Sequence, residues 1–420
     1  MARRIFTRRQ VFFFAGAIAV VGGARHTTHR IARAAPASGP LSDSAKKLIA
    51  KAWEGLDPKK VLDTHVHIVG TGDGGSGCFV GPRMTSLTNP MDYLKFTLYE
   101  EASGVQNSRH TDEEYLATLT GLVAGQSPHG RLLLFAFDQY HGEDGKPVKS
   151  ESEFYTPNDY VLKIAQAHPE LFVPAASVHP YRADAVNELE RCVAQGASAV
   201  KWLPNAMNID PSSPKCDPFY EAMARLKIPL ISHAGEEKAV HAEERQRLGN
   251  PLHLRRALEH GVTVVIAHCA SLGDNPDLDL PGGADGGAPW VDNFELFLRL
   301  MGEKQWEGKL FGDISALTIV NRIGAPLERV LKDSALQKRL VNGSDYPLPA
   351  INVLMQTRAV ESHGLITAEE RELLNEIDRH DPLLMDFVMK RTIRLKADGK
   401  EYRFDDDVFT ARPEVFPTLA

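Results

Sequence analysis

The sequence predicts an α/β protein folded as a (β/α)8 TIM barrel, for two reasons. Between residues 60 and 350, eight short apolar runs recur, each followed by a polar or glycine-bearing turn and then an amphipathic stretch. Fully apolar runs are typical of parallel strands covered by helices, and eight strand–helix units over this length match the size of such a barrel. The runs are 61–67, 132–137, 171–178, 199–203, 229–232, 262–267, 310–314 and 340–343.

Amphipathic stretches between these runs predict the outer helices of the barrel. Residues 185–194, 218–226 and 251–260 have this pattern, and Gly261 follows the third of them, as is typical of a helix C-terminus. Residues 367–396 also show helical patterning. We therefore expect further helices after the last strand.

An open, doubly wound sheet is the alternative arrangement. That fold normally carries a glycine-rich phosphate-binding turn after its first strand. Here His65 and His67 stand at that point, and the glycine-rich stretch 70–77 is not a GxGxxG pattern leading into an evident helix. We interpret 70–77 as a mobile first loop, and the glycine-rich, acidic stretch 273–287 as the loop after the sixth strand. Loops on this rim of a barrel build active sites.

The N-terminal region predicts an export signal. Residues 1–34 hold seven arginines and no Asp, Glu or Lys, and the pair Arg8-Arg9 precedes an apolar run at 11–21. This layout, with a small-x-small pattern ending at Ala34, is typical of a cleaved signal, and the paired arginines resemble the twin-arginine type. A membrane anchor is the alternative, but 11 apolar residues fall short of the roughly 20 that span a bilayer. We expect the twin-arginine export machinery as a partner and a periplasmic or extracellular location.

The rest of the chain divides into three parts. We expect a linker with a short helix at 35–58, the barrel with its C-terminal helices at 59–396, and a loose tail at 397–420. No later segment has 18 uninterrupted apolar residues, so we expect no membrane span in the mature chain. A net charge of −7 argues against nucleic acid as a partner. Four cysteines without CxxC spacing indicate neither a zinc ribbon nor a disulfide scaffold.

Polar residues at the ends of the predicted strands indicate a metal site. His65 and His67 are two apart on one strand, so both side chains leave on the same face, about 7 Å apart at the backbone. His233 ends the fifth strand, His268 the sixth and Asp345 the eighth. All five would point to the C-terminal mouth of the barrel. Clustered imidazoles with a carboxylate suit zinc or a similar divalent ion.

Four segments together resemble the amidohydrolase superfamily: 63–67 (DTHVH), 230–235 (LISHAG), 265–269 (VIAHC) and 342–347 (NGSDYP). Residues 199–205 (AVKWLPN) with 209–211 (IDP) resemble, more narrowly, the amidohydrolase-related group that includes aminocarboxymuconate-semialdehyde decarboxylase and lactonases. The resemblance implies one ion or two. It assigns His65, His67, His233 and Asp345 as metal ligands, with His268 in the catalytic or second-metal position.

Lys201 distinguishes between binuclear and mononuclear forms of the predicted metal site. Alternation along 199–203 places Val200 and Trp202 toward the helix layer, which turns Lys201 into the barrel. In binuclear members of the superfamily, a lysine ending the fourth strand is carboxylated and bridges two metals, and Lys201 falls on that strand. The alternatives are an ammonium paired with a carboxylate or one that contacts an anionic substrate.

The sequence predicts a metal-dependent hydrolase of an ester, lactone or amide. Asp345 would act as ligand and base, and His268 would polarise the carbonyl. A non-oxidative decarboxylase in the same fold is the first alternative, and a non-catalytic metal-binding protein of the cell envelope is the second. Candidates for contact with a small-molecule substrate are Arg83, Arg182, Trp202 and Asn205.

Overall fold

The computed structural model describes residues 39–240, 242–283 and 287–419. The predicted export signal at 1–34 lies outside the described residues. Within the described part of the chain, the helices are all too short or too polar to cross a membrane.

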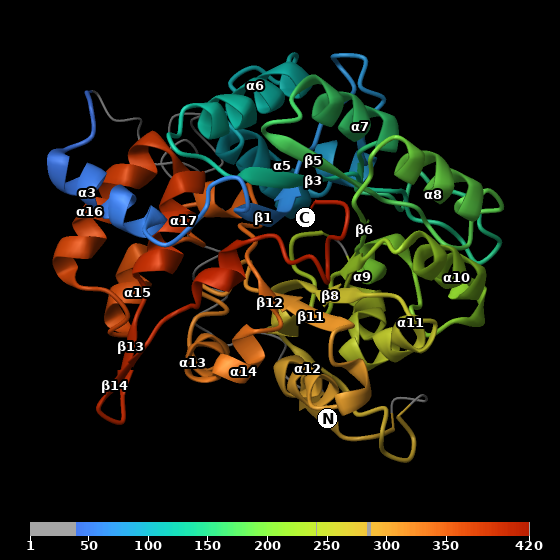
Figure 1. Cartoon of the computed structure of the whole chain (residues 1–420). Coiled ribbons are helices and arrows are strands. Elements are labelled where there is room, and N and C mark those ends of the chain that lie inside the picture. The colour runs from blue at the N-terminus through green and yellow to red at the C-terminus, as the bar shows by residue number, and fades with distance from the viewer. Residues whose placement is uncertain (1–38, 241, 284–286, 420) are drawn as a thin grey trace.

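Eight parallel strands form the centre of the molecule (Figure 1). They pair with one another in chain order, and residues just after the last strand form hydrogen bonds with the first. The N–H of Thr64 donates to the carbonyl of Asn342 over 2.9 Å, and the N–H of Asp345 donates to the carbonyl of His65 over 2.8 Å. The predicted (β/α)8 barrel is thus confirmed, with one strand in each of the eight apolar runs. The strands are Leu62–His67 (β1), Arg131–Phe135 (β3), Phe172–Ala176 (β5), Ala199–Trp202 (β6), Leu230–Ser232 (β7), Val264–Ile266 (β8), Leu310–Asp313 (β11) and Leu340–Val341 (β12).

Helices surround this barrel (Figure 1). The helix predicted at 185–194 is confirmed, and that predicted at 218–226 begins one residue earlier. The stretch 251–260 folds as a 3-10 turn, Pro251–Leu254, followed by a short α-helix that ends before Gly261. The barrel helices are Thr111–Ala124 (α6), Asn158–Ala167 (α7), Ala185–Ala194 (α8), Pro204–Met207 (α9), Asp217–Leu226 (α10), Arg255–Glu259 (α11), Asn293–Met301 (α12), Ala325–Lys332 (α13) and Ser334–Gln337 (α14).

Helices from both ends of the described chain pack together beside the barrel. The short helix expected within 35–58 is present as Asp43–Trp53 (α3), and it packs on Ala368–His380 (α16) and Pro382–Thr392 (α17) (Figure 1). The rings of Trp53 and Phe387 lie 4.6 Å apart. The remaining elements are Pro82–Thr85 (α4), Pro90–Ala102 (α5), Thr357–Ser362 (α15), and the short strand pairs Phe79–Val80 (β2) with Phe154–Tyr155 (β4), Asp274–Pro276 (β9) with Trp290–Asp292 (β10), and Leu395–Ala397 (β13) with Lys400–Tyr402 (β14).

The glycine-rich loop 70–77 is folded around one carboxylate. Asp112, at the start of α6, accepts hydrogen bonds from the N–H groups of Thr71, Gly72 and Gly74 and from the hydroxyl of Ser76. The loop that we expected to be mobile therefore has a defined contact with the first barrel helix. Its glycines let the backbone approach this carboxylate, since a Cβ at Gly70 would overlap the Asp112 side chain.

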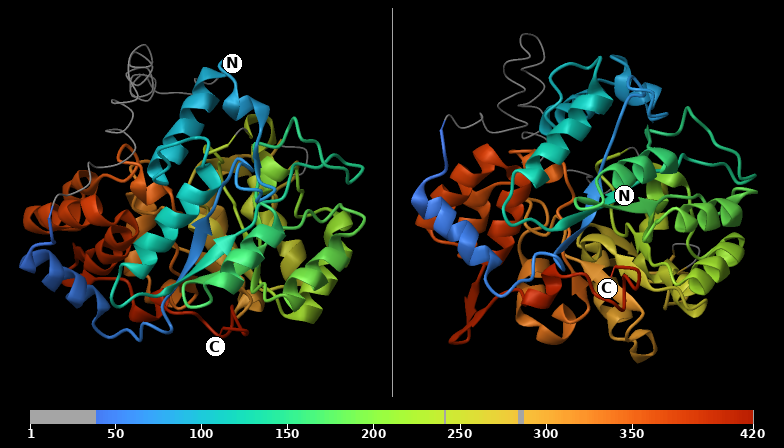
Figure 2. Two further views of the ribbon diagram at one scale, coloured as in Figure 1. Left: turned by 90° about the horizontal axis from the view of Figure 1, so that it is seen from above. Right: turned by 45° about the horizontal axis from the view of Figure 1, so that its top comes forward.

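The C-terminal residues close one end of the barrel, so the expectation of a loose tail at 397–420 was wrong. Val415 and Phe416 are buried among the residues that fill the barrel interior, such as Leu62, Phe135 and Ile231. Arg412 donates to the carbonyl of Leu340, which places the tail at the N-terminal ends of the strands. In Figure 1 the chain end lies over the middle of the barrel, and in the left panel of Figure 2 it lies opposite α5. The apolar residues of this segment are spaced irregularly among polar ones, so they gave a weak sequence signal for this packing.

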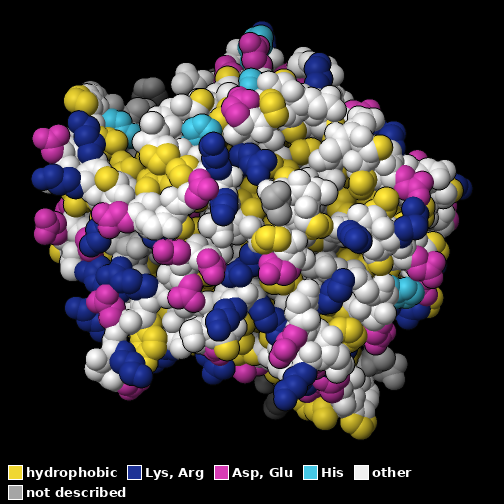
Figure 3. All heavy atoms as spheres, viewed as in Figure 1, with side chains coloured by type: hydrophobic (Ala, Val, Ile, Leu, Met, Phe, Trp, Pro, Cys, Tyr) yellow, Lys and Arg dark blue, Asp and Glu magenta, His cyan; other side chains and the backbone are white. Residues whose placement is uncertain are grey.

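Charges of both signs are interspersed on the face that carries this tail (Figure 3). Arg412 belongs to this tail and lies beside the start of β12.

Phe416→Ala should lower the free energy of unfolding by about 3–5 kcal/mol, because it removes a fully buried aromatic side chain from the barrel interior. Urea denaturation followed by circular dichroism measures this change. Glu414→Ala, two residues away and exposed, serves as the control and should have little effect. Equal stability of the two variants would show that burial of Phe416 in the barrel does not stabilise the fold.

Candidate metal centre

The five strand-end residues predicted as a metal site meet at the C-terminal mouth of the barrel. One Asp345 oxygen lies 3.4 Å from Nε2 of His65 and 3.3 Å from Nε2 of His67. The other lies 3.7 Å from Nε2 of His268. These separations exceed the usual charge-assisted hydrogen bond. They are close to the roughly 3.3 Å expected between two ligand atoms of one tetrahedral zinc ion with bonds of about 2.0–2.1 Å. His65, His268 and Asp345 each offer a ligand atom, and these atoms lie within 4.8 Å of one another.

The backbone is bent sharply where two of these residues leave their strands. His268 has φ 55° and Asp345 has φ 62°, a left-handed conformation that costs a non-glycine residue of order 1–3 kcal/mol. Hydrogen bonds hold both residues there. The N–H of His268 donates to Asp313 over 2.9 Å, and the N–H of Asp345 donates to the carbonyl of His65. This bent backbone directs both side chains into the mouth of the barrel.

Asp313, at the end of β11, orients the cluster from behind. Its carboxylate lies 2.9 Å from Nδ1 of His65 and also accepts the N–H of Ser315 over 3.0 Å, and the hydroxyl of Ser315 lies 2.7 Å from Nδ1 of His268. A carboxylate on Nδ1 leaves Nε2 free to face a metal, as is common around bound ions. Burial acts to raise the pKa of Asp313, but His65 and His268 outweigh it and hold that pKa below its usual range.

We did not single out Asp313 from the sequence. A signal was available, because Asp313 is a carboxylate near the end of the seventh apolar run, close to where the other site residues stand in theirs. Ser315, two residues further along, had no comparable signal.

Burial sets the protonation of the cluster. It lowers the pKa of His67 to about 4 and that of His268 to about 3, so both rings are neutral at pH 7 and offer lone pairs. It also lowers the pKa of His233 well below its usual value. Burial acts to raise the pKa of Asp345, but His268 and His65 outweigh it and hold it well below the usual range. Neutral imidazoles beside an ionised carboxylate are the forms that bind a metal.

Lys201 points into the barrel, as the alternation along β6 predicts. Its Nζ lies 3.1 Å from Nε2 of His65 and 4.8 Å from the centre of the Phe135 ring. Burial lowers the pKa of Lys201 to about 8, although Asp313 and Asp345 act to raise it. Carboxylation of this lysine stays a prediction.

A cavity of about 110 Å³ opens onto these residues. Its walls are mainly apolar and come from the ends of several strands, the loops that follow them, and helices α5 and α6. Glu237 adds a carboxylate to this lining that the sequence analysis did not identify. The lining residues are His65, His67, Ile68, Val69, Tyr99, Tyr115, Phe137, Phe154, Thr156, Lys201, Leu203, His233, Glu237, Ala239, Val240, His268, Asp345, Pro347 and Leu348.

The structure does not bring two of the four proposed substrate contacts to this cavity, because Trp202 of β6 faces the helix layer and Asn205 lies in a helix. Trp202 is fully buried, stacks on Phe219 of α10 at 5.5 Å and donates from Nε1 to the carbonyl of Val178. Asn205 is fully buried in α9 and donates to the carbonyl of Gly235. Both residues fix the frame around the mouth.

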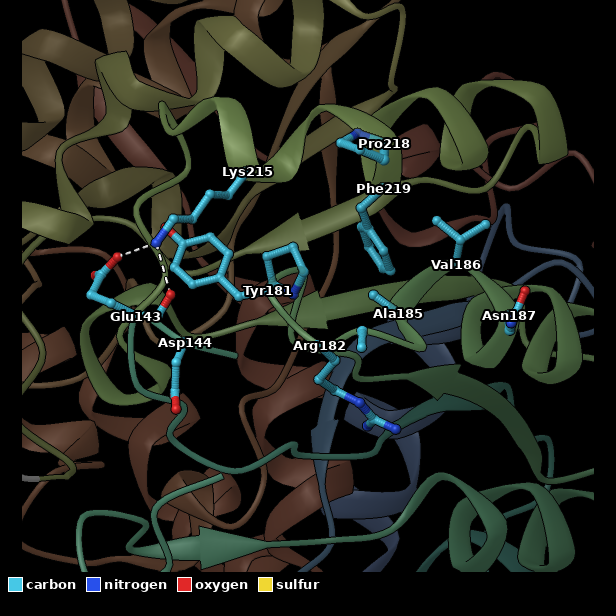
Figure 4. A pocket seen from close by; sticks show the side chains of 12 residues that line it. Glu143, Asp144, Tyr181, Arg182, Ala185, Val186, Asn187, Lys215, Pro218 and Phe219 are labelled. Carbon is cyan, nitrogen blue, oxygen red and sulfur yellow. Dashed lines mark hydrogen bonds and ion pairs between the residues drawn. The ribbon is translucent and has the colours of Figure 1, made fainter. Parts of the chain in front are cut away.

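The two arginines proposed as substrate contacts also lie away from the cavity. Arg83 in α4 pairs with Asp92. Arg182 pairs with Asp138 and Asp184 and lines a separate pocket of about 420 Å³ at the start of α8 (Figure 4). Acidic partners within the protein already occupy both guanidinium groups.

A buried ion pair supports the turn that carries Asp345. Nζ of Lys390, on α17, donates over 2.6 Å to Asp386 and over 2.6 Å to the carbonyl of Gly343. Lys390 and Asp386 are both almost fully buried. The C-terminal helices thereby hold the end of β12 in place.

The fold and these residues define a class: TIM barrels with a histidine- and aspartate-rich candidate metal centre at the mouth. The amidohydrolase family model matches residues 63–351, and the chain belongs to this family. No curated protein matches the chain.

Several solved structures are similar to this chain at low sequence identity. A TIM-barrel protein from Bordetella bronchiseptica is 16% identical, with 78% of this chain and 99% of that chain covered and a TM-score of 0.44. 5-Carboxyvanillate decarboxylase from Sphingomonas paucimobilis is 12% identical, with 85% of this chain and 99% of that chain covered and a TM-score of 0.44. 4-Oxalomesaconate hydratase from Rhodopseudomonas palustris is 16% identical, with 79% of this chain and 98% of that chain covered and a TM-score of 0.39.

Lys390→Met should lower the free energy of unfolding by about 3–5 kcal/mol, since it leaves the Asp386 carboxylate buried without its partner. Thermal and urea denaturation measure this change. Lys396→Met, at an exposed position of β13, is the matched control and should be nearly neutral. If Lys390→Met were as stable as Lys396→Met, the ion pair would not support the Asp345 turn.

Proposed function

We propose that the protein is a metal-dependent hydrolase that acts on a carbonyl group of a small, largely apolar ester, lactone or amide. The observation that carries this proposal is the position of Asp345. It lies among three imidazoles at the floor of a cavity whose walls are mainly apolar. Membership of the amidohydrolase family, whose members are enzymes, supports a catalytic role.

The residues present fit a divalent ion, and we propose zinc. Neutral imidazoles and one ionised carboxylate form a donor set that zinc prefers. His65, His67, His233 and Asp345 would hold the ion, with His268 beside them. When bound in such a site, a divalent ion polarises a carbonyl and makes water nucleophilic at neutral pH.

The residues of the chain supply the remaining chemistry. Asp345 is placed to accept a proton from the attacking water and to return it to the leaving group. His268, whose Nδ1 faces Ser315, presents Nε2 to the cavity, where it can stabilise negative charge that develops on the carbonyl oxygen. The apolar walls would exclude bulk water and strengthen these interactions.

A decarboxylase of a carboxylated substrate is the second candidate, and one observation favours it. Lys201 lies on the cavity wall, and its ammonium group could pair with a substrate carboxylate. The same lysine contacts His65, so it also suits a role within the metal centre. Assays of released carbon dioxide and of hydrolysis products, run on one panel of esters, lactones, amides and aromatic acids, separate the two reactions.

Asp345→Asn should lower kcat by about 10²–10⁴-fold, because the amide cannot accept the proton that the carboxylate takes. Steady-state kinetics on the best substrate of the panel measures this loss, and circular dichroism checks the fold. Asp144→Asn, in an exposed loop, is the control. A near-normal rate in Asp345→Asn would exclude this base. Metal binding without turnover of any panel member would instead favour a non-catalytic metal-binding protein.

We also propose that residues 1–34 direct the chain through a twin-arginine export route to the periplasm or the cell exterior. The basic stretch, the apolar run and the small residues before position 35 support this.

Replacing Arg8 and Arg9 together by lysine should keep the protein inside the cell, because the paired arginines are the part of the signal that the export machinery reads. Cell fractionation with immunoblotting measures the distribution. The matched control replaces Arg3 and Arg4 by lysine and should still be exported. Export of the Arg8 and Arg9 variant at the control level would contradict a twin-arginine signal.

A further inference from the structure

Glu237 contributes a carboxylate to the cavity that none of the roles assigned above explains. It follows β7 by a few residues and lines the same cavity as the metal cluster. Its side chain is buried, with 6% exposed. One of its oxygens lies 3.5 Å from Nε2 of His233.

His233 has no other partner at that nitrogen. Its Nε2 is buried and makes no hydrogen bond to the described residues. A buried polar atom without a partner costs of order 1–3 kcal/mol, so such an atom in a native site calls for a bound group. An ordinary N–H to carboxylate hydrogen bond would bring the two atoms to about 2.7–2.9 Å. At 3.5 Å they are instead spaced like two ligands of one ion, as the Asp345 pairs are.

The local structure holds this carboxylate in place. Oε1 accepts the N–H groups of Ala239 at 2.5 Å and Val240 at 3.2 Å. The backbone of Glu237 exchanges two hydrogen bonds with the Gln246 side chain, each of 2.8 Å. The hydroxyl of Tyr99, on α5, donates to the carbonyl of Ala239 over 3.0 Å. One oxygen is thus used by the protein, and Oε2 is left to face His233.

We propose that Glu237 is a direct ligand, through Oε2, of a divalent cation that His233 also binds. A carboxylate oxygen and an imidazole nitrogen are both donors for zinc and similar ions. The inference rests on the metal centre proposed above and extends it by a carboxylate after the fifth strand. It requires neither hydrolysis nor decarboxylation as the reaction.

The neighbouring residue provides a matched control. Glu236 is partly exposed and pairs with Lys238 at 3.0 Å, and it does not line the cavity. Glu236→Gln and Glu237→Gln therefore remove the same charge from adjacent positions. The amide oxygen that Glu237→Gln introduces can still accept the N–H groups of Ala239 and Val240, so the loop should keep its shape.

The test is metal binding to the full chain, stripped with a chelator and then titrated with Zn²⁺ or Co²⁺. Calorimetry should show at least one ion bound at least about tenfold more weakly by Glu237→Gln than by the wild type or Glu236→Gln, since even changes behind the ligands cost about 10–100-fold. The visible spectrum of bound Co²⁺ should change in Glu237→Gln alone. Equal affinities and spectra in all three proteins would overturn the proposal.

Should Glu237→Gln not fold, crystals of the wild type grown with Zn²⁺ decide the question. An anomalous peak within bonding distance of both His233 Nε2 and Glu237 Oε2 supports the proposal, and a zinc ion bound without Glu237 overturns it. A protein that is inactive on every substrate but loses metal in Glu237→Gln would refute the proposed hydrolase and leave this inference standing.

Discussion

The contact between the last strand and the first is the constraint on which the site depends. Asp345 can face His65 and His67 only because the chain after β12 runs directly beside β1, joined by backbone hydrogen bonds. Gly343 makes this approach possible, since a Cβ there would lie 2.6 Å from Cβ of His65. Closure of the barrel and assembly of the metal centre are therefore one event.

Buried carboxylates surround that contact on several sides. Asp313 holds His65 from behind, and Asp63 accepts the N–H of Ser344 over 2.8 Å, which ties the start of β1 to the turn before Asp345. Burial raises the pKa of Asp63 to about 7, although Ser344 and Lys390 act to lower it. So many charged groups in a dry interior are costly unless each has partners. The hydrogen bonds of these buried carboxylates hold the candidate ligands in fixed orientations.

The sequence revealed the parts of the structure that follow a short-range pattern. The eight apolar runs and the polar residue that ends a run were enough to predict the barrel, the five strand-end residues and the inward side of Lys201. The roles of Asp313 and Glu237 depend on which loops meet in space, and no spacing along the chain encodes that. Trp202 was wrongly proposed as a substrate contact. It follows Lys201 directly on β6, and adjacent residues on a strand point to opposite faces. The packing of Val415 and Phe416 was missed because the apolar residues of the tail are spaced irregularly and carry no periodicity.

The buried tail has a consequence for how the protein forms. Leu62 in the first strand and Phe416 near the chain end belong to the same apolar cluster, although roughly 350 residues separate them. Synthesis proceeds from the N-terminus, and a domain generally folds as a unit. Here Leu62 can contact Phe416 only after residue 416 has left the ribosome. The end of the barrel that the tail covers would thus stay open until the last residues are made, and chaperones would have access to it during that time.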